Sequence, residues 1–473
     1  MKKKMVALLL VVTLSFAGIM PVTAATTSKC KSVPTKVKLN RKKATITVHQ
    51  TVKFVLKKAK AKQVKWKSSD SSIATVSRKG LVTGKKKGIV TITAKYKKKK
   101  YKATVKVKKA LTVTTVNANG SSLKQGIYLL DDLYEGENII VSPFSLNMAL
   151  GMVANGTTPS AKSDCETYLG KTVEQFNKDS LQWMEKAKKD DAISLANGVW
   201  YEKGYKVKEA FKNAVENNYL ATVKETGMDQ NTIDEVNQWA SDNTDGMIKR
   251  VIKEIQPRTV AILSNALLFK GNWTDKFYEG ATEKEDFTDA KGVRKKVDMM
   301  HSTEHAYYEN DYARAFEKTY ENGRYSFIGI LPKEQGDFSL QNLDIEGLLK
   351  TRTTQYGVKI GLPKFSYEWN NSLNDTLMKT PLKSVYDMAA NPLGEMLYTA
   401  DPIYVSDIRQ SCKISVDEKG TVAAAVTTVI VKDGAMFTKE YKTINMNRPF
   451  GYLIKDNTTN EVLFMGKVVE INS

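Results

Sequence analysis

Two stretches of strict alternation mark the first part of the chain. Apolar residues alternate with Thr and Lys over residues 90–96 and again over residues 101–108. A period of two is typical of antiparallel strands with one face buried and the other in water. Gly, Ser and Asp recur at short spacing between such runs, at the places where turns are needed. Residues 26–109 therefore predict a small β-sandwich, with Trp66 as its core aromatic residue.

The pattern changes after a short linker over residues 110–117. Apolar residues follow helical spacing over residues 121–134, and Gly136 ends that run. An extended stretch over residues 138–145 precedes a second helical run over residues 146–153. Helical and strand-like runs then continue in mixed order, without an internal repeat, so residues 118–473 predict one large α+β domain.

The first 25 residues have the form of a secretory signal peptide. Residues 2–4 are Lys, residues 5–20 are mostly apolar, and Pro21 precedes small residues that permit cleavage after Ala24 or Ala25. The alternative is a membrane anchor, but the run is short for a span and its end can be cleaved. We therefore expect a secreted, extracellular protein.

Charge separates the two parts of the chain. The 473 residues carry a net charge of +22, but residues 26–109 hold 28 Lys and Arg against the single acid Asp70, whereas residues 110–473 are mildly acidic. An outward lysine array attracts anionic polymers, so attachment to anionic cell-wall polymer is one reading and a solvated spacer is the other. Nucleic acid is not expected, because the lysines are not interleaved with an aromatic platform.

Catalytic and metal-binding motifs are missing from the sequence. It contains no GxSxG, GxxxxGK[ST] or HExxH pattern, and it has only three His and three Cys. His301 and His305 can share a helix face, yet no third ligand stands near them, so no metal or other cofactor is expected. Cys165 and Cys412 are expected to be buried structural residues. The sequence does not predict an enzyme.

One segment near the C-terminus combines conflicting local signals. From Gly420 to Val431 it has small and β-branched residues and no charge, so both of its faces suit a central strand. It runs directly into a polar stretch over residues 432–439 that is typical of an open loop. Such a conflict between a strand-like segment and a loop indicates a functional element.

The basic part resembles a known family. Residues 64–84 (VKWKSSDSSIATVSRKGLVTG) and 88–94 (GIVTITA) are similar to the group 2 bacterial immunoglobulin-like domain. This resemblance implies an all-β Ig-like sandwich used as a surface, adhesion or spacer module.

The large part resembles the serpins, the serine protease inhibitor family. The hinge-like segment 418–427 (EKGTVAAAVT) is joined by further matches in serpin order. They are residues 138–145 (NIIVSPFS), 195–197 (LAN), 237–248 (NQWASDNTDGMI), 264–273 (SNALLFKGNW), 362–365 (LPKF), 447–450 (NRPF) and 463–468 (LFMGKV).

This resemblance implies a fold, a mechanism and a set of site residues. The fold has three β-sheets, about nine helices and an exposed reactive-centre loop. A target serine endopeptidase attacks the loop and forms an acyl complex, and the cleaved loop inserts into the central sheet, called sheet A. The implied hinge residues are Glu418, Lys419, Gly420, Thr421, Val422, Ala423, Ala424, Ala425, Val426 and Thr427. The residues implied beneath the opening of the sheet are Ser142, Ser145, Asn265, Trp273 and Gln410.

Two positions depart from the family pattern. Val426 stands where the family has Ala or Gly, and its bulk is expected to slow insertion. Gln410 stands where most serpins have His, and it is expected to hydrogen-bond to Asn265 and Ser142 instead.

The scissile bond is confined to a window. Family spacing counted forward from Glu418 gives Gly434, and counted back from Pro449 gives Thr438, so the window holds Gly434, Ala435, Met436, Phe437 and Thr438. The window has no basic residue, which favours elastase-, subtilisin- or chymotrypsin-like targets over trypsin-like ones. The alternative is a non-inhibitory serpin-fold adhesion or binding protein at the cell surface. In either case a monomer is expected.

Overall fold

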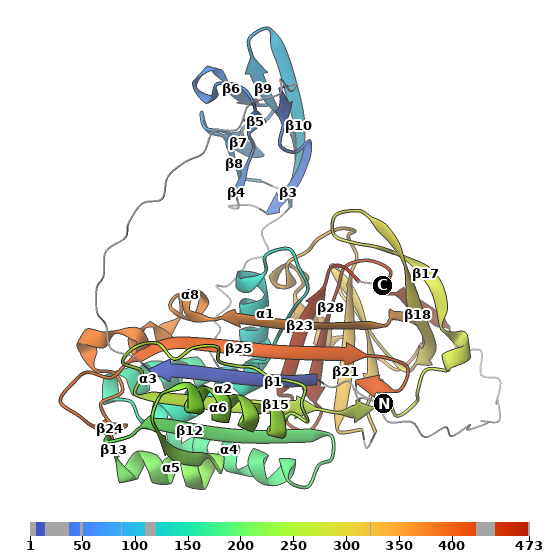
Figure 1. The fold of residues 1–473 in the computed structure, drawn as a ribbon. Coiled ribbons are helices and arrows are strands. Elements are labelled where there is room, and N and C mark those ends of the chain that lie inside the picture. Colours follow the sequence, from blue (N-terminus) through green and yellow to red (C-terminus); the bar gives the residue numbers. More distant parts are fainter. Residues whose placement is uncertain are drawn as a thin grey trace. The chain divides into compact units, whose positions relative to one another are not determined.

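The computed structural model describes the chain in two compact units. The described residues are 6–14 (backbone), 37–47, 51–86, 88–108, 120–321, 323–421 and 440–471. The larger unit comprises Met1–Gly18 and Val116–Ser473, and the smaller unit is Ile19–Thr115 (Figure 1).

The smaller unit is built from strands packed face to face. A four-stranded sheet has the order β3-β10-β9-β6, a three-stranded sheet has the order β4-β8-β7, and β2 pairs with β5. The strands are β2 (Lys38–Leu39), β3 (Lys43–Thr47), β4 (Thr51–Lys53), β5 (Leu56–Lys57), β6 (Lys65–Ser68), β7 (Ala74–Val76), β8 (Leu81–Gly84), β9 (Gly88–Tyr96) and β10 (Lys99–Lys108). The alternation of the sequence thus appears as the hairpin β9–β10.

The core aromatic residue of this unit differs from the prediction. Phe54 is fully buried, together with Val82, Ile92 and Val105. Trp66 is only partly buried, because it lies on β6 at the edge of the four-stranded sheet, where it lines the core from one side. Its ring packs under Gly80, where an added Cβ would come within 2.8 Å of it.

The larger unit contains sheets of eight, six and four strands and a two-stranded ribbon. The eight-stranded sheet has the order β14-β12-β15-β1-β25-β26-β16, with β23 paired to β25; the others are β11-β29-β28-β21-β20-β19, β17-β18-β22-β27 and β13-β24. The strands of the first sheet are β1 (Val6–Leu14), β12 (Ile193–Glu202), β14 (Thr222–Thr226), β15 (Ala261–Phe269), β16 (Gly271–Asn272), β23 (Phe365–Ser372), β25 (Val405–Val416) and β26 (Gly420–Thr421).

The remaining strands of this unit are β11 (Ile139–Val141), β13 (Lys206–Val207), β17 (Glu283–Thr288), β18 (Arg294–Glu304), β19 (Ala306–Glu309), β20 (Ala313–Thr319), β21 (Tyr325–Pro332), β22 (Gly357–Pro363), β24 (Leu397–Tyr398), β27 (Tyr441–Asn445), β28 (Phe450–Asp456) and β29 (Val462–Val468). Its α-helices within the described residues are α1 (Ser122–Leu133), α2 (Pro143–Asn155), α3 (Pro159–Leu169), α4 (Val173–Ala187), α5 (Glu209–Tyr219), α6 (Gln230–Asn243), α7 (Ile345–Lys350) and α8 (Asn374–Leu377). None of the described helices is long and apolar enough to cross a bilayer.

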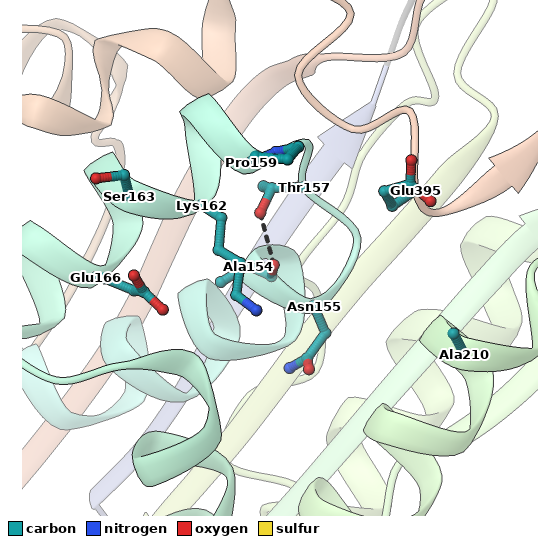
Figure 2. A pocket seen from close by; sticks show the side chains of 9 residues that line it. All are labelled: Ala154, Asn155, Thr157, Pro159, Lys162, Ser163, Glu166, Ala210 and Glu395. Atoms are coloured by element: carbon teal, nitrogen blue, oxygen red, sulfur yellow. Dashed lines mark hydrogen bonds between the residues drawn. The ribbon is translucent and has the colours of Figure 1, made fainter.

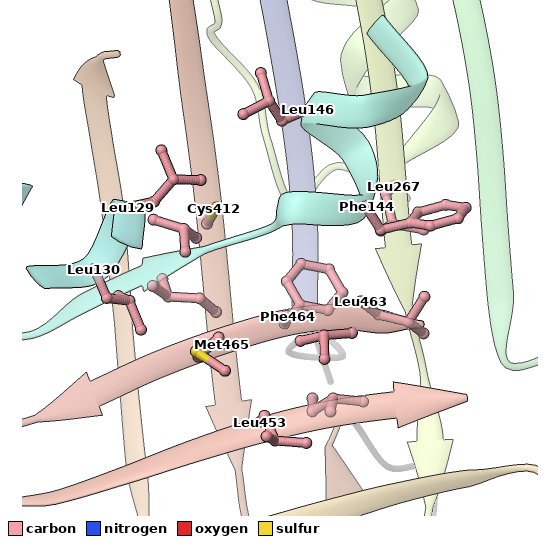
Figure 3. Packing of buried hydrophobic residues seen from close by; sticks show 14 of the residues in the cluster. Leu129, Leu130, Phe144, Leu146, Leu267, Cys412, Leu453, Leu463, Phe464 and Met465 are labelled. Carbon is pink, nitrogen blue, oxygen red and sulfur yellow. The ribbon is translucent and has the colours of Figure 1, made fainter. Parts of the chain in front are cut away.

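The main core joins helices α1 and α2 to strands of two different sheets. Leu129 and Phe144 come from the helices, Leu267 from β15, and Leu453 and Phe464 from β28 and β29, and all five are buried (Figure 3). Helix α2 starts at a cap, since the Ser142 side chain accepts a hydrogen bond from the Ser145 amide. This cap satisfies one of the amides that the first turn of α2 leaves without a partner.

The apolar run of the expected leader is a strand in this structure. The backbone of β1 pairs antiparallel with β15 on one side and with β25 on the other (Figure 1). Since β15 and β25 both run antiparallel to β1, they run parallel to each other, and β1 fills the gap between them.

Candidate functional site

The predicted hinge begins in a tight turn at the end of β25. The Asp417 carboxylate accepts hydrogen bonds from the amides of Lys419 and Gly420, and the Asp417 amide donates to the Gly420 carbonyl. This turn reverses the chain, so that β26 starts back along β25. Thr421 then lies opposite Val416 of β25 and opposite Gly271 of β16.

Glu418 anchors the turn through its side chain. Its carboxylate lies 2.9 Å from the Lys364 ammonium and accepts a hydrogen bond of 2.9 Å from the Thr282 hydroxyl. Burial raises the pKa of Glu418, but the Lys364 and Thr282 contacts outweigh it, and the pKa lies below its ordinary value of 4.5. The same pair raises the pKa of Lys364, although burial opposes this. At neutral pH the turn is thus fixed by an ion pair.

Gly420 and Thr421 enter the sheet where space is limited. A Cβ on Gly420 would lie 2.0 Å from the Gly271 carbonyl oxygen, so only glycine allows this approach of the two backbones. Thr421 is fully buried, and its hydroxyl lies 2.5 Å from the Tyr320 hydroxyl. Two hinge residues, Gly420 and Thr421, are therefore already part of the eight-stranded sheet.

A cluster of aromatic residues contacts the turn at the start of the hinge. The Trp273 ring stacks on the Tyr320 ring at 4.4 Å, and its indole N–H donates to the Asp417 carbonyl at 3.0 Å. The backbone amides of Trp273 and Phe277 donate to the carbonyls of Lys419 and Glu418. Every residue from Asp417 to Lys419 thus has its carbonyl bound to this group.

A second group of buried polar residues forms a hydrogen-bond network between α2 and the strands that flank β1. The Gln410 side chain accepts a hydrogen bond from the Ser142 amide and donates one to the Ser142 carbonyl, both at 2.9 Å. The Ser145 hydroxyl donates to Asn265, and the Asn265 amide donates to Asn197 at 2.8 Å. All of these residues are buried, so the network fixes α2 to the strands on both sides of the gap.

One expected contact of this network is not found. Gln410 bonds to Ser142 as expected, but the described residues show no bond between Gln410 and Asn265. The reason is β1, because Leu10 pairs with Asn265 on one side and with Gln410 on the other. An intervening strand separates its two neighbours by about 9–10 Å, which is too far for a direct hydrogen bond.

The hinge and β1 occupy successive positions in the same gap. If the register of β26 continued unchanged, Ala424 would lie opposite Lys413 of β25 and Leu268 of β15. Ala7 of β1 lies opposite these same two residues. By the same register, residues 423–431 correspond position by position to Val6–Leu14.

The rest of the predicted site lies outside the described residues. This concerns the hinge positions from Val422 to Thr427 and the scissile window from Gly434 to Thr438. Sequence reasoning missed Tyr320, Thr282 and the role of Lys364. Of these three residues, only Lys364 could have been identified from the sequence, because it falls within the LPKF match to serpins.

The other candidate residues are structural. His301 lies on strand β18, not on a helix, and its ring nitrogen is 2.8 Å from Glu285. No cluster of potential metal ligands occurs in the described part of the chain. Burial raises the pKa of the Cys165 thiol to about 12 and that of Cys412 well above its ordinary value, which makes both thiols unreactive.

An open pocket of about 610 Å³ lies away from the hinge. It is formed by the end of α2, by α3 and by Ala210 and Glu395 (Figure 2). Its charged residues are already engaged: Glu166 accepts from the Val173 amide, and Glu395 pairs with Lys208. None of the predicted site residues lines this pocket.

Comparison with known proteins gives the context of this site. A family model described as serpin (serine protease inhibitor) matches residues 124–471, and one described as bacterial Ig-like domain (group 2) matches residues 33–107. An uncharacterized serpin-like protein of Thermococcus kodakarensis is 32% identical over 373 residues, which cover 72% of this chain and 83% of that protein. Serpin-Z10 of Arabidopsis thaliana is 28% identical over 381 residues, covering 75% and 97%.

A solved structure agrees with these relatives. The crystal structure of tengpin, a thermophilic serpin, in the native state matches with a TM-score of 0.66 and 28% identity, and it covers 77% of this chain and 96% of that one. The family model covers most of the chain and the predicted motifs fall in its range. The chain therefore belongs to the serpin family and carries a group 2 bacterial Ig-like domain before its serpin domain.

Proposed function

We propose that this protein inhibits serine endopeptidases by inserting its cleaved reactive-centre loop into the eight-stranded sheet, which is sheet A. The observation that carries the proposal is the register of the hinge. Thr421 pairs with β16 on one side and β25 on the other, and Gly420 pairs with β16. Residues 423–431 can continue that register, since β1 occupies the corresponding nine positions.

The chemistry of the trap comes from the protease. Its serine hydroxyl attacks a carbonyl in the window 434–438, an ester forms, and the new amine on the C-terminal side of the broken bond leaves. The loop then holds the protease by its N-terminal side and is free to follow the hinge into the gap. Inhibition requires that insertion is faster than hydrolysis of the ester.

The composition of residues 422–431 suits rapid insertion. They contain no charge and no Pro, so no residue forfeits ladder hydrogen bonds or carries a charge between the strands. The contacts of Glu418 with Lys364 and Thr282 hold the starting turn in place. The hinge is thus set before cleavage occurs.

The target and the location follow from the sequence. Because residues 434–438 contain no Lys or Arg, we propose an elastase-, subtilisin- or chymotrypsin-like target. We also propose that residues 1–25 are removed on export and that the processed protein acts outside the cell. Members of the family are generally inhibitors, and we propose no catalytic activity for this chain.

The test is a denaturing gel of the processed chain, residues 26–473, mixed with one protease of each class. We expect a covalent band at the summed mass with at least one protease of the proposed classes and none with trypsin. Cleavage between residues 434 and 438 without any covalent band would contradict inhibition. It would favour a non-inhibitory binding protein with the same fold.

A further inference from the structure

We propose that one face of the smaller unit is a binding surface for a linear polyanion with phosphate in its backbone. This inference concerns a different unit and does not depend on protease inhibition. The surface is the outer side of the four-stranded sheet β3-β10-β9-β6, and we call it the basic face. The described residues on it are Lys43, Lys65, Lys67, Ile89, Thr91, Thr93, Lys95, Lys100, Lys102, Thr104 and Lys106.

Strand pairing aligns these side chains in rows. Lys65 lies opposite Lys95, and Lys95 lies opposite Lys100, so three lysines on three strands form one row. Neighbouring strands are about 4.8 Å apart, and the whole row therefore spans about 10 Å. All three side chains are exposed.

The next two rows on the basic face contain both lysine and threonine. The next row contains Lys67, Thr93 and Lys102, and the third contains Thr91, Thr104 and Lys43. Rows on the same face follow each other at about 6.6–6.8 Å along the strands. The basic face therefore offers a two-dimensional array of ammonium and hydroxyl donors.

This arrangement reduces the stability of the unit on its own. Like charges directly opposite each other on neighbouring strands are destabilising. Asp70 is the single acid of residues 26–109, and the cation that interacts with its carboxylate is Lys86, which does not belong to the basic face. A multivalent anion bound across the rows would remove this repulsion.

The second sheet of the same unit provides a comparison. The register of β4-β8-β7 places Lys53, Leu81, Thr75 and Thr83 on its outer side. Among these residues Lys53 is the one cation. The lysines of the two sheets are thus concentrated on one face, which net charge alone does not require.

The form of the basic face indicates the kind of polymer. Trp66, Tyr96 and Tyr101 belong to the inner side of the sheet, where they pack against a core cluster, so the outer side has no aromatic ring on which a base can stack. A polymer with a phosphate backbone and without bases fits this surface better than single-stranded nucleic acid does. The threonine hydroxyls can donate to phosphate oxygens between the lysines.

The test compares two triple variants of the full chain. Lys65→Gln/Lys95→Gln/Lys100→Gln removes one row, and Lys53→Gln/Lys60→Gln/Lys79→Gln removes three exposed lysines outside the basic face. The probe is inorganic polyphosphate, with binding measured by calorimetry over a series of salt concentrations. We expect the row variant to lose roughly tenfold or more in affinity and to show a lower salt slope, and the control to lose less than about threefold.

A second measurement verifies folding and tests the row itself. At low salt the row variant should melt at a higher temperature than the control variant, because only the row variant removes directly opposed charges. If the row variant unfolds, Lys95→Gln alone replaces it, with Lys53→Gln as its control.

Two outcomes would overturn the proposal. Equal loss of polyphosphate binding in both triple variants would mean that net charge, and not the basic face, attracts the polymer. Binding of phosphatidylglycerol vesicles that depends on the row, without binding of polyphosphate, would mean that the surface recognises a lipid membrane.

Discussion

Two segments of this chain fit the same place in sheet A. Residues 6–14 (VALLLVVTL) occupy the gap between β15 and β25, and residues 423–431 (AAAVTTVIV) would reach the same nine positions by continuing the register of the hinge. Both segments are uncharged and free of Pro. By composition and register, the loop segment therefore suits the positions that β1 occupies.

The two segments differ in how they are attached. The loop segment begins two residues after Thr421, which is fixed by Tyr320, Val416 and Gly271. The other segment lies in the expected leader and would leave with it on processing. If the leader is removed on export, as we propose, only the loop segment remains to enter the gap.

The largest effect is expected when leader removal and loop cleavage are combined. In the processed chain, cleavage within residues 434–438 should let about nine residues form ladder hydrogen bonds, which contribute on the order of 5–14 kcal/mol. The melting temperature should rise by roughly 10–20 °C. In the unprocessed chain the same cleavage should change it little, because β1 already fills the gap. Calorimetry of the four forms, processed or unprocessed and each cleaved or uncleaved, measures these melting temperatures.

A charge within the leader provides the matched control. Leu10→Lys introduces a charge at the strand position that pairs with Asn265 and Gln410, two fully buried residues, and an unpaired charge in buried surroundings is costly. The unprocessed Leu10→Lys chain should then respond to loop cleavage as the processed chain does. If both unprocessed chains gain as much stability on cleavage as the processed one, the two segments do not compete.

If the chain inhibits proteases as we propose, a charge at the hinge should convert it into a substrate. Thr421→Arg would carry a guanidinium into a fully buried position beside Tyr320 and delay insertion. We expect the ratio of covalent complex to cleaved chain to fall roughly tenfold or more, while the protease still cuts the untouched window. Thr421→Val keeps the size of the side chain and loses only the hydroxyl contact with Tyr320. Its ratio of covalent complex to cleaved chain should therefore lie between that of the parent chain and that of Thr421→Arg. An unaltered ratio in Thr421→Arg would argue against insertion through this hinge.

These contacts also show what the sequence could predict. Alternation predicted β9 and β10, because local periodicity determines which side of a strand is buried. The resemblance supplied the hinge, but the partners of Glu418 and Thr421 are 54 and 101 residues away, and no local pattern identifies them. The apolar run of residues 6–14 suits a leader helix as well as a strand, and tertiary pairing determines which forms.

The contacts of the Glu418 side chain with Lys364 and Thr282 should stabilise the start of the loop segment and not β1, and their effect should depend on pH. The folded pKa of Glu418 lies below its ordinary 4.5, so its stabilising effect is complete well above pH 4.5 and is lost as the pH falls below that value. Glu418→Gln should lower the melting temperature of the uncleaved processed chain by a few degrees at pH 7 and by less at acidic pH, where Glu418 itself becomes protonated. A difference of equal size at both pH values would show that the ion pair with Lys364 is not its cause.

The smallest effect is expected at Val426, the residue that departs from the family pattern. In the shared register Val426 would take the position of Leu9, which lies opposite Ala266 on β15 and Ser411 on β25. Both neighbours are small, so they leave room for a branched side chain, and the bulk of Val426 should slow insertion only slightly. Val426→Ala should therefore raise the ratio of covalent complex to cleaved chain by less than about twofold, since the change in crowding is small. A gel of the processed variant and parent chain against one susceptible protease measures this ratio. A rise of roughly tenfold would mean that the loop segment does not follow the register that β1 defines, since a different register would bring Val426 against larger neighbours.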